Sequence, residues 1–245
     1  MAKICDATFT DFRNLQDKIS KLVNGVASFE DAAQTYTAAL YEAFKESIVL
    51  VRLFVTVPYE KLPIPNRKFV DHLALSKKDR QLIHDNTLVL SLVGTSGVKP
   101  EWNDRHQSQG HVGIPLVSAD FIDAIPMMSR LLKQLGMDLN WIDTRDTRVV
   151  TRTIGSLSGV FFVRDAATEV DQKGRKIIAA QDFVTTYHVK TVFGFGGGYL
   201  NTPTFFVTIN FLRETLEKNQ AERFAAAMSF FKAITVRLVE GQIFA

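Results

Sequence analysis

Apolar positions predict a helix at the start of the chain. Between residues 12 and 26 they recur at alternating intervals of three and four, which is the narrow stripe of a helix that packs against one partner helix. The stripe consists of Phe12, Leu15, Ile19, Leu22 and Val26. It predicts either a helix packed on its own domain or a helix that pairs with a second copy of the chain, and the spacing fits both equally.

Capping residues and apolar spacing predict further helices. Ser28, with Asp31 three residues later, indicates a helix over 29–43. Asn219, with Glu222, indicates a closing helix that Gly241 ends. Between them the pattern predicts a short polar helix over 77–84, a helix over 118–135 that Pro126 kinks, and a helix over 177–189.

Runs that are apolar at odd and even positions predict buried strands. The clearest is 48–57, rich in β-branched residues, and 88–93 is a second, ended by Gly94 and Gly97. Further strands are predicted over 149–154, 159–164, 191–195 and 204–211. The glycines of 194–199 are predicted to turn the last two into a hairpin, with positive φ. A phosphate-binding loop is disfavoured there, because such a loop leads from a strand into a helix.

The order of these elements predicts the fold class. Strands and helices do not alternate strictly, so a doubly wound parallel sheet is disfavoured. We expect an α/β (α+β) protein with a single mixed, mainly antiparallel sheet, helices on one face, and the N- and C-terminal helices packed together. At 245 residues, one core with insertions is the expected organisation.

Composition narrows the possible partners and location. The formal charge of +3 is the difference between 29 basic and 26 acidic residues, so nucleic acid is not an expected partner. Polar residues interrupt the N-terminus and each apolar run, so we predict neither a signal peptide nor a membrane span, and a cytoplasmic location. Nineteen phenylalanines indicate a bulky core or an apolar cavity, and we favour the core.

The densest polar cluster, residues 101–111, is the candidate ligand site. It lies between two apolar runs that would hold both its ends. Trp102 could stack on a planar ligand and Arg105 could pair with a carboxylate or phosphate. Asn103, His106 and His111 could donate hydrogen bonds. The alternative is a solvent-exposed connection.

Two arginines interrupt apolar strands. Arg52 and Arg164 would each need a partner or water if they faced the core. We favour strand-end positions that point to water. The alternative is contact with an anionic ligand, and on that ground Arg52 joins the tentative ligand residues.

No catalytic or metal-binding set is predicted. His106 and His111 are five residues apart, which does not match a zinc-binding helix, and Cys5 is the only cysteine. The segment 155–159 has glycine at both ends but leucine at its centre, so it is no nucleophile elbow. No cofactor is identified from the residues.

With these residues in view, the chain resembles the GAF-like sensor domains of the GAF/PAS superfamily. Segment 51–55 is similar to the family's first strand, 181–195 to its helix, turn and strand before the final hairpin, and 205–213 with 221–238 to its last strand and closing helix. More narrowly, 94–106 with 110–118 resembles input modules of bacterial sensor histidine kinases and related signalling proteins. The implied division is an N-terminal signalling helix over 1–28 and a sensor domain over 29–245, with insertions at about 58–87 and 98–117.

The resemblance implies a non-catalytic sensory or regulatory domain of bacterial signal transduction. Such a domain would bind a small molecule, form a homodimer, and signal through its terminal helices to a downstream partner. The family has no shared catalytic residues, and bilin-binding members need a suitably placed cysteine, whereas Cys5 precedes the whole fold. The alternatives are an enzyme that acts on a small anionic substrate through 102–111, with His111 essential, and a ligand-free protein-interaction module.

Overall fold

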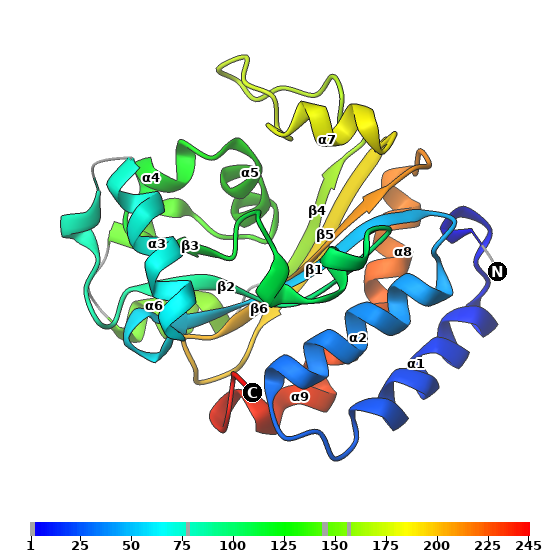
Figure 1. Cartoon of the computed structure of the whole chain (residues 1–245), viewed down its shortest axis with the longest axis horizontal. Coiled ribbons are helices and arrows are strands. Elements are labelled where there is room, and N and C mark those ends of the chain that lie inside the picture. The colour runs from blue at the N-terminus through cyan, green and yellow to red at the C-terminus, as the bar shows by residue number, and fades with distance from the viewer. Residues whose placement is uncertain (1–2, 77–78, 144–146, 156–157) are drawn as a thin grey trace.

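The computed structural model describes residues 3–76, 79–143, 147–155 and 158–245, and places six strands in one sheet (Figure 1). The strand order is β3-β2-β1-β6-β5-β4, and every neighbouring pair is antiparallel. The strands are β1 (Ile48–Pro58), β2 (Leu88–Gly97), β3 (Gly113–Pro115), β4 (Ser158–Val163), β5 (Thr191–Gly198) and β6 (Phe205–Leu212). The predicted class, α+β around a mainly antiparallel sheet, is confirmed.

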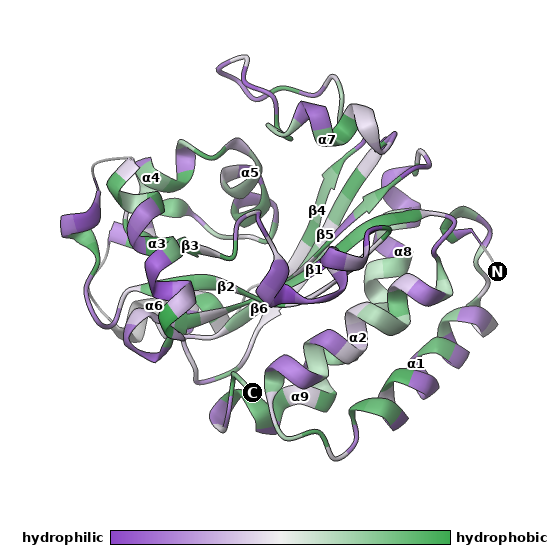
Figure 2. Cartoon of the chain, in the orientation of Figure 1, coloured by the Kyte–Doolittle hydropathy of each residue, from purple (hydrophilic) through white to green (hydrophobic). Residues whose placement is uncertain are grey.

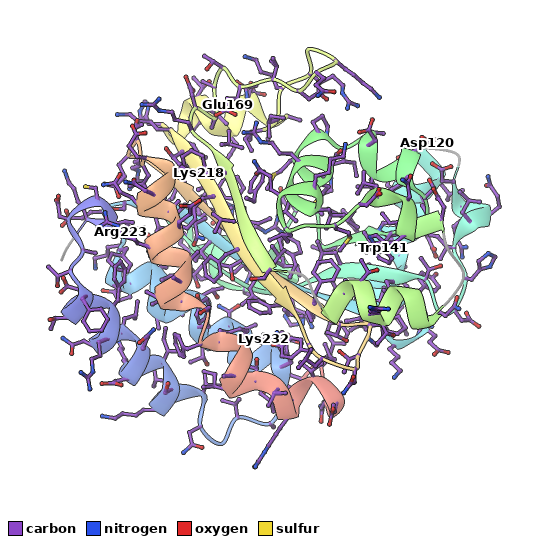
Figure 3. The ribbon with its side chains drawn as sticks, turned by 180° about the vertical axis from the view of Figure 1, so that it is seen from behind. Asp120, Trp141, Glu169, Lys218, Arg223 and Lys232 are labelled. Atoms are coloured by element: carbon purple, nitrogen blue, oxygen red, sulfur yellow. The ribbon has the colours of Figure 1, made fainter. Side chains whose placement is uncertain are left out.

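One face of the sheet carries the four long terminal helices. They are α1 (Phe9–Val23), α2 (Phe29–Ala43), α8 (Lys218–Met228) and α9 (Phe231–Glu240). The predicted packing of the terminal helices against each other is confirmed: the ring centroids of Phe12 on α1 and Phe224 on α8 are 5.6 Å apart. Apolar sides turn inward, while Lys218 and Arg223 are exposed on α8 (Figures 2 and 3).

Shorter helices and loops cover the opposite face, so the expectation of helices on one face only is wrong. They are α4 (Ala119–Asp123), α5 (Pro126–Gln134), α6 (Thr147–Gly155) and α7 (Gln181–Thr186). Helix α3 (Ile64–Ser76) packs against the edge strand β3, and its buried Val70 and Ala74 belong to the core of the terminal helices. Single 3-10 turns lie between these elements or before α1: η1 (Ile4–Asp6), η2 (Tyr59–Lys61), η3 (Arg80–Leu82), η4 (Pro100–Asn103), η5 (Arg105–Gln107) and η6 (Leu139–Asp143). The sheet therefore separates two hydrophobic cores.

Gly97 ends β2 as predicted, but the other glycines of the strands do not act as predicted. Gly94 does not end β2: a Cβ there would lie 2.5 Å from the carbonyl oxygen of Ala33, so glycine lets α2 approach the strand. The glycines from 194 to 198 continue β5, and a Cβ on Gly198 would lie 1.6 Å from the carbonyl oxygen of Ile154. The hairpin turns after Tyr199 instead, where Asn201 has a φ of 61°. Close packing, rather than a turn, requires these glycines.

Three predicted elements differ in the structure. Residues 149–154 belong to helix α6 and not to a strand, because β-branched residues bias the backbone only weakly and tertiary packing overrides them. The helix predicted over 177–189 is confined to α7. The short helix predicted over 77–84 is a 3-10 turn at Arg80–Leu82, with 77 and 78 outside the described residues, and α3, just before it, was not predicted.

The helices around prolines and caps are closer to expectation. Pro126 divides the predicted helix into α4 and α5, because it lacks the N–H that a helix interior needs but fits a first turn. The closing helix is also two helices, α8 and α9. Its cap is Glu217, paired with Gln220, rather than Asn219. Ser28 caps α2 as predicted, since its hydroxyl accepts from the N–H of Asp31 at 3.0 Å.

Candidate binding cavity

A cavity of about 510 Å³ lies on the face of the sheet that carries the shorter helices. Its floor is formed by residues of β1, β2, β3 and β6. Its walls are the loop after β2, the start of α5, the segment before α7, and α7 itself. Its lining includes Arg52, Thr95, Trp102, Met127, Phe183 and Tyr187. Its volume and its mainly apolar lining are those of a small-molecule site.

Arg52 reaches the cavity from the central strand. In the sheet it is paired with Thr95 on β2 and Ile209 on β6, and all three line the cavity. Its Nη2 donates to the Ser108 hydroxyl at 2.8 Å and to the carbonyl oxygen of His111 at 2.9 Å. Burial lowers the pKa of Arg52 to about 10, so it stays charged at neutral pH. The preferred interpretation of a water-facing arginine is wrong for Arg52. It holds for Arg164, which is 62% exposed and pairs with Glu217.

An aromatic cluster forms one wall. Trp102 lies with its ring centroid 4.9 Å from that of Tyr187 and 5.7 Å from that of Phe183. Phe183 in turn meets Phe211 edge-on at 5.3 Å. Gly97 makes room for this arrangement, since a Cβ there would lie 2.9 Å from the Trp102 ring. The cluster offers ring faces and edges to a planar ligand.

Lys99 and Glu101 stand at the mouth. The Lys99 ammonium is 5.9 Å from the centroid of the Trp102 ring and 5.7 Å from that of Tyr187. A hydrogen bond to Tyr187 raises the pKa of Lys99 above its usual value. Lys99 and Glu101 also form an ion pair at 3.5 Å, with side chains 45% and 48% exposed, so their charges largely compensate each other.

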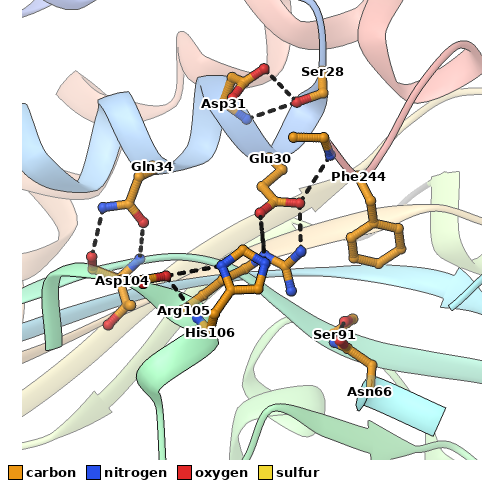
Figure 4. A network of polar contacts seen from close by, with 12 residues as sticks. Ser28, Glu30, Asp31, Gln34, Asn66, Ser91, Asp104, Arg105, His106 and Phe244 are labelled. Atoms are coloured by element: carbon orange, nitrogen blue, oxygen red, sulfur yellow. Dashed lines mark hydrogen bonds and ion pairs between the residues drawn. The ribbon is translucent and has the colours of Figure 1, made fainter. Parts of the chain in front are cut away.

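Three of the predicted ligand residues, Asn103, Arg105 and His106, hold the loop instead of lining the cavity. Figure 4 shows the contacts of Arg105 and His106. Arg105 is buried and pairs with Glu30 of α2 through two hydrogen bonds, Nη2 to Oε2 at 2.6 Å and Nε to Oε1. The Asn103 side chain accepts from the N–H of Gly97 at 3.0 Å and donates to the carbonyl oxygen of Lys99 at 3.0 Å. His106 is 64% exposed, with Nδ1 2.9 Å from Asp104. These contacts fix the loop to α2 and to β2.

The other three, Arg52, Trp102 and His111, do line the cavity. Sequence reasoning missed the residues of the facing wall: Met127, Ile177, Ile178, Phe183 and Tyr187. A signal for two of them was present, because Phe183 and Tyr187 lie within the helix predicted over 177–189. Nothing in the sequence, however, placed that helix opposite the loop.

The described residues offer little for metal or covalent chemistry. Within them, no group of three His, Cys, Asp or Glu side chains could hold a metal ion. Cys5 lies in η1 and packs on the core of the opposite face, and burial raises the pKa of its thiol to about 11. It is therefore separated from the cavity by the sheet. Across the described ranges, no helix is long and apolar enough to cross a bilayer.

Comparisons with known proteins show a likeness of shape. No family model and no curated protein matches the chain. Among solved structures, the chain is similar to the phycoerythrobilin-bound GAF domain from a cyanobacterial phytochrome, at 12% sequence identity and a TM-score of 0.44. The match covers 94% of this chain and 92% of that one. The cavity and its residues therefore carry the functional conclusions below.

Proposed function

We propose that this chain is a non-catalytic, GAF-like sensory or regulatory domain of bacterial signal transduction that binds a small molecule in the cavity. It acts in the cytoplasm as a homodimer, and its terminal helices transmit the conformational effect of ligand binding to a downstream partner. The observation that carries the proposal is the cavity of about 510 Å³ on the sheet, walled by the aromatic cluster and reached by Arg52. A filled interaction module would lack such a space.

The loop after β2 provides a route from the cavity to the helical layer. Trp102 lines the cavity, while its neighbour Asn103 accepts a hydrogen bond through its backbone carbonyl from Gln34 of α2 at 3.2 Å. Two residues further on, Arg105 pairs with Glu30 at the start of α2. A ligand that moves Trp102 must therefore shift these contacts or strain them. This is the differential interaction that a two-state sensor requires.

The same end of α2 holds the C-terminal segment. The N–H of Glu30 donates to the carbonyl oxygen of Ile243 at 2.8 Å, and the N–H of Ala245 donates to the Glu30 carboxylate at 3.1 Å (Figure 4). Arg105 also lies over the Phe244 ring, at 5.3 Å from its centroid. The loop, the start of α2 and the segment after α9 thus meet at one carboxylate.

The test uses N-phenyl-1-naphthylamine, a neutral fluorescent probe smaller than the cavity. We expect the parent chain to bind it, and Met127→Trp, which fills the cavity, to lose most of that binding. Leu200→Trp is the matched control, because it adds the same side chain at a position that is 72% exposed. Hydrogen exchange is then measured with and without the probe, and we expect slower exchange in α2.

Two results would count against the proposal. Absent binding to the parent chain, or equal binding to both tryptophan variants, would contradict a ligand cavity. Binding without any change of exchange in α2 would contradict the transmission of binding to the helices. Circular dichroism of each variant shows whether it retains the parent fold.

A further inference from the structure

The cavity contains a charge that its own lining does not neutralise. Its charged residues among those described are Arg52, Lys99 and Glu101, with His111 as a further titratable group. Lys99 and Glu101 compensate each other at the mouth, whereas both hydrogen-bond partners of Arg52, the Ser108 hydroxyl and the His111 carbonyl oxygen, are neutral. The floor of the cavity is therefore net positive.

Arg52 also has donors to spare. Its two hydrogen bonds to described residues leave from Nη2, and its guanidinium lies 5.2 Å from the centroid of the Phe54 ring. Gly110 passes close to Nη1, because a Cβ there would lie 3.2 Å from that atom. A guanidinium presents five N–H donors in a planar fork, so Nη1 and Nε can still donate to a ligand.

The charge restricts what can fill the cavity. A neutral apolar ligand that covered Arg52 would strip water from the guanidinium and give nothing in return, which is costly for a buried charge, so such a ligand can bind only along the aromatic wall. A cationic ligand would meet the Arg52 charge, and the Lys99 ammonium already occupies the cationic position beside the Trp102 and Tyr187 rings. A ligand with a negative group avoids both costs.

The number of charges separates carboxylates from phosphates. The single charge of the guanidinium matches that of one carboxylate, which Nη1 or Nε can reach with a charge-assisted N–H···O bond. A phosphate monoester carries up to two charges, and the described lining offers no second unpaired cation for it, because Lys99 is paired with Glu101. The aromatic wall favours a flat ring for the remainder of the ligand.

We propose that the cavity takes a planar, ring-containing monocarboxylate, with its carboxylate on Arg52 and its ring among Trp102, Phe183 and Tyr187. This assignment rests on the proposed function, since it names the class of ligand for the same cavity. It requires no chemical step.

The experiment compares three probes that share one ring system. Calorimetry at neutral pH gives the affinities of 2-naphthoate, its neutral analogue 2-naphthamide, and 2-naphthyl phosphate. We expect 2-naphthoate to bind about tenfold more tightly than 2-naphthamide, because a charge-assisted hydrogen bond is about twice as strong as a neutral one. We expect it also to bind more tightly than the phosphate.

Two arginine variants assign the preference to its residue. Arg52→Met should abolish the preference for the carboxylate, whereas Arg164→Met, which removes the exposed arginine just after β4, should retain it. If Arg52→Met does not fold, Arg52→Lys keeps the charge without the planar fork and should retain part of the preference. The three-probe comparison on the parent chain decides the question without any variant.

The failures can be told apart. Three results would overturn the carboxylate assignment: equal affinity for 2-naphthoate and 2-naphthamide, tighter binding of 2-naphthyl phosphate, or no binding of any of these three probes. None of these results would affect the proposed function as long as N-phenyl-1-naphthylamine binds and Met127→Trp removes its binding. If N-phenyl-1-naphthylamine does not bind the parent chain, or binds Met127→Trp equally well, the proposed function itself is contradicted.

Discussion

Arg105 and Arg52 show how the partner of a guanidinium decides its role. Arg105 faces the Glu30 carboxylate, and both side chains are less than one tenth exposed. Arg52 faces a hydroxyl and a carbonyl oxygen instead. The first charge is neutralised by the chain and holds the loop on α2. The second is left for a group from outside the chain.

The buried pair leads to a prediction about stability. Arg105→Met leaves the Glu30 carboxylate buried without its cation, which costs on the order of 3–5 kcal/mol in the free energy of unfolding. Lys45→Met removes the exposed partner of Glu42, and a surface pair contributes only about 0–1 kcal/mol. Urea unfolding of both variants measures the difference. Equal midpoints for the two would show that the Arg105 pair is no more than a surface contact.

At the scale of elements, one carboxylate ties α4 to α5 and to the loop before the cavity wall. Asp123, at the end of α4, accepts from Lys173 at 2.6 Å and from the Ser129 hydroxyl at 3.0 Å. Its backbone carbonyl accepts from Arg175 at 2.8 Å. The loop then leads into Ile177 and Ile178, which line the cavity. The position of that wall therefore depends on an ionised Asp123.

This contact predicts a dependence on pH. The hydrogen bond from Lys173, followed by that from Ser129, lowers the pKa of Asp123 from 3.8 to about 2. A pKa that is lower in the folded state stabilises the fold above the unfolded value, and this contribution is lost as pH falls through about 2. We expect Asp123→Asn to reduce the loss of thermal stability between about pH 5 and pH 2. Asp17→Asn, on the exposed side of α1, is the control, and an equal reduction there would contradict the prediction.

The sequence predicted some elements well for a physical reason. β1 is apolar at both parities because each of its faces contacts a hydrophobic core, so composition alone indicated a central strand. Residues 149–154 were misassigned, since a short run of β-branched residues fits a strand and a tertiary-stabilised helix equally. The glycines of β5 were assigned to a turn, because the sequence contains no sign that α6 approaches Gly198 closely in the fold.

The candidate site was predicted in position but not in detail. The polar loop does form one wall, with Trp102 and His111 directed to the cavity. Arg105 and Asn103 lie in the same few residues but turn to α2 and β2, because the 3-10 turns point successive side chains in different directions. Periodicity does not describe such a segment. Apart from Met127, the facing wall comes from residues 177–187, far along the chain from the loop, so only the fold brings it near.

At the scale of the whole molecule, the terminal helices determine how a dimer can form. Most of the first stripe of apolar residues is used inside the chain: Ile19 is fully buried, and Phe12 packs against Phe44 and Phe224. The large apolar side chains left exposed on these helices are Leu22, which belongs to the stripe, Phe9 of α1 and Val236 of α9. A second copy would cover these three and not the buried part of the stripe.

The proposed homodimer is tested on those positions. We expect light scattering to report a dimer for the parent chain and a monomer for the double variant Leu22→Ser, Val236→Ser, without loss of thermal stability. Leu75→Ser, at an exposed position on α3, is the control and should leave the dimer intact. A monomeric parent chain would remove the dimer from the proposal and leave the cavity unaffected.

The central pair of the sheet joins the first quarter of the chain to the last. β1 bonds β2 on one side and β6 on the other, so Val51 lies opposite Asn210. During synthesis from the N-terminus, β1 and β2 can pair early, but the second edge of β1 stays open until β6 has emerged from the ribosome. Such distant pairing slows folding, and an open apolar edge invites association with other chains. The last strand to be made thus closes the middle of the sheet, and a chain truncated before residue 205 would leave β1 as an exposed edge.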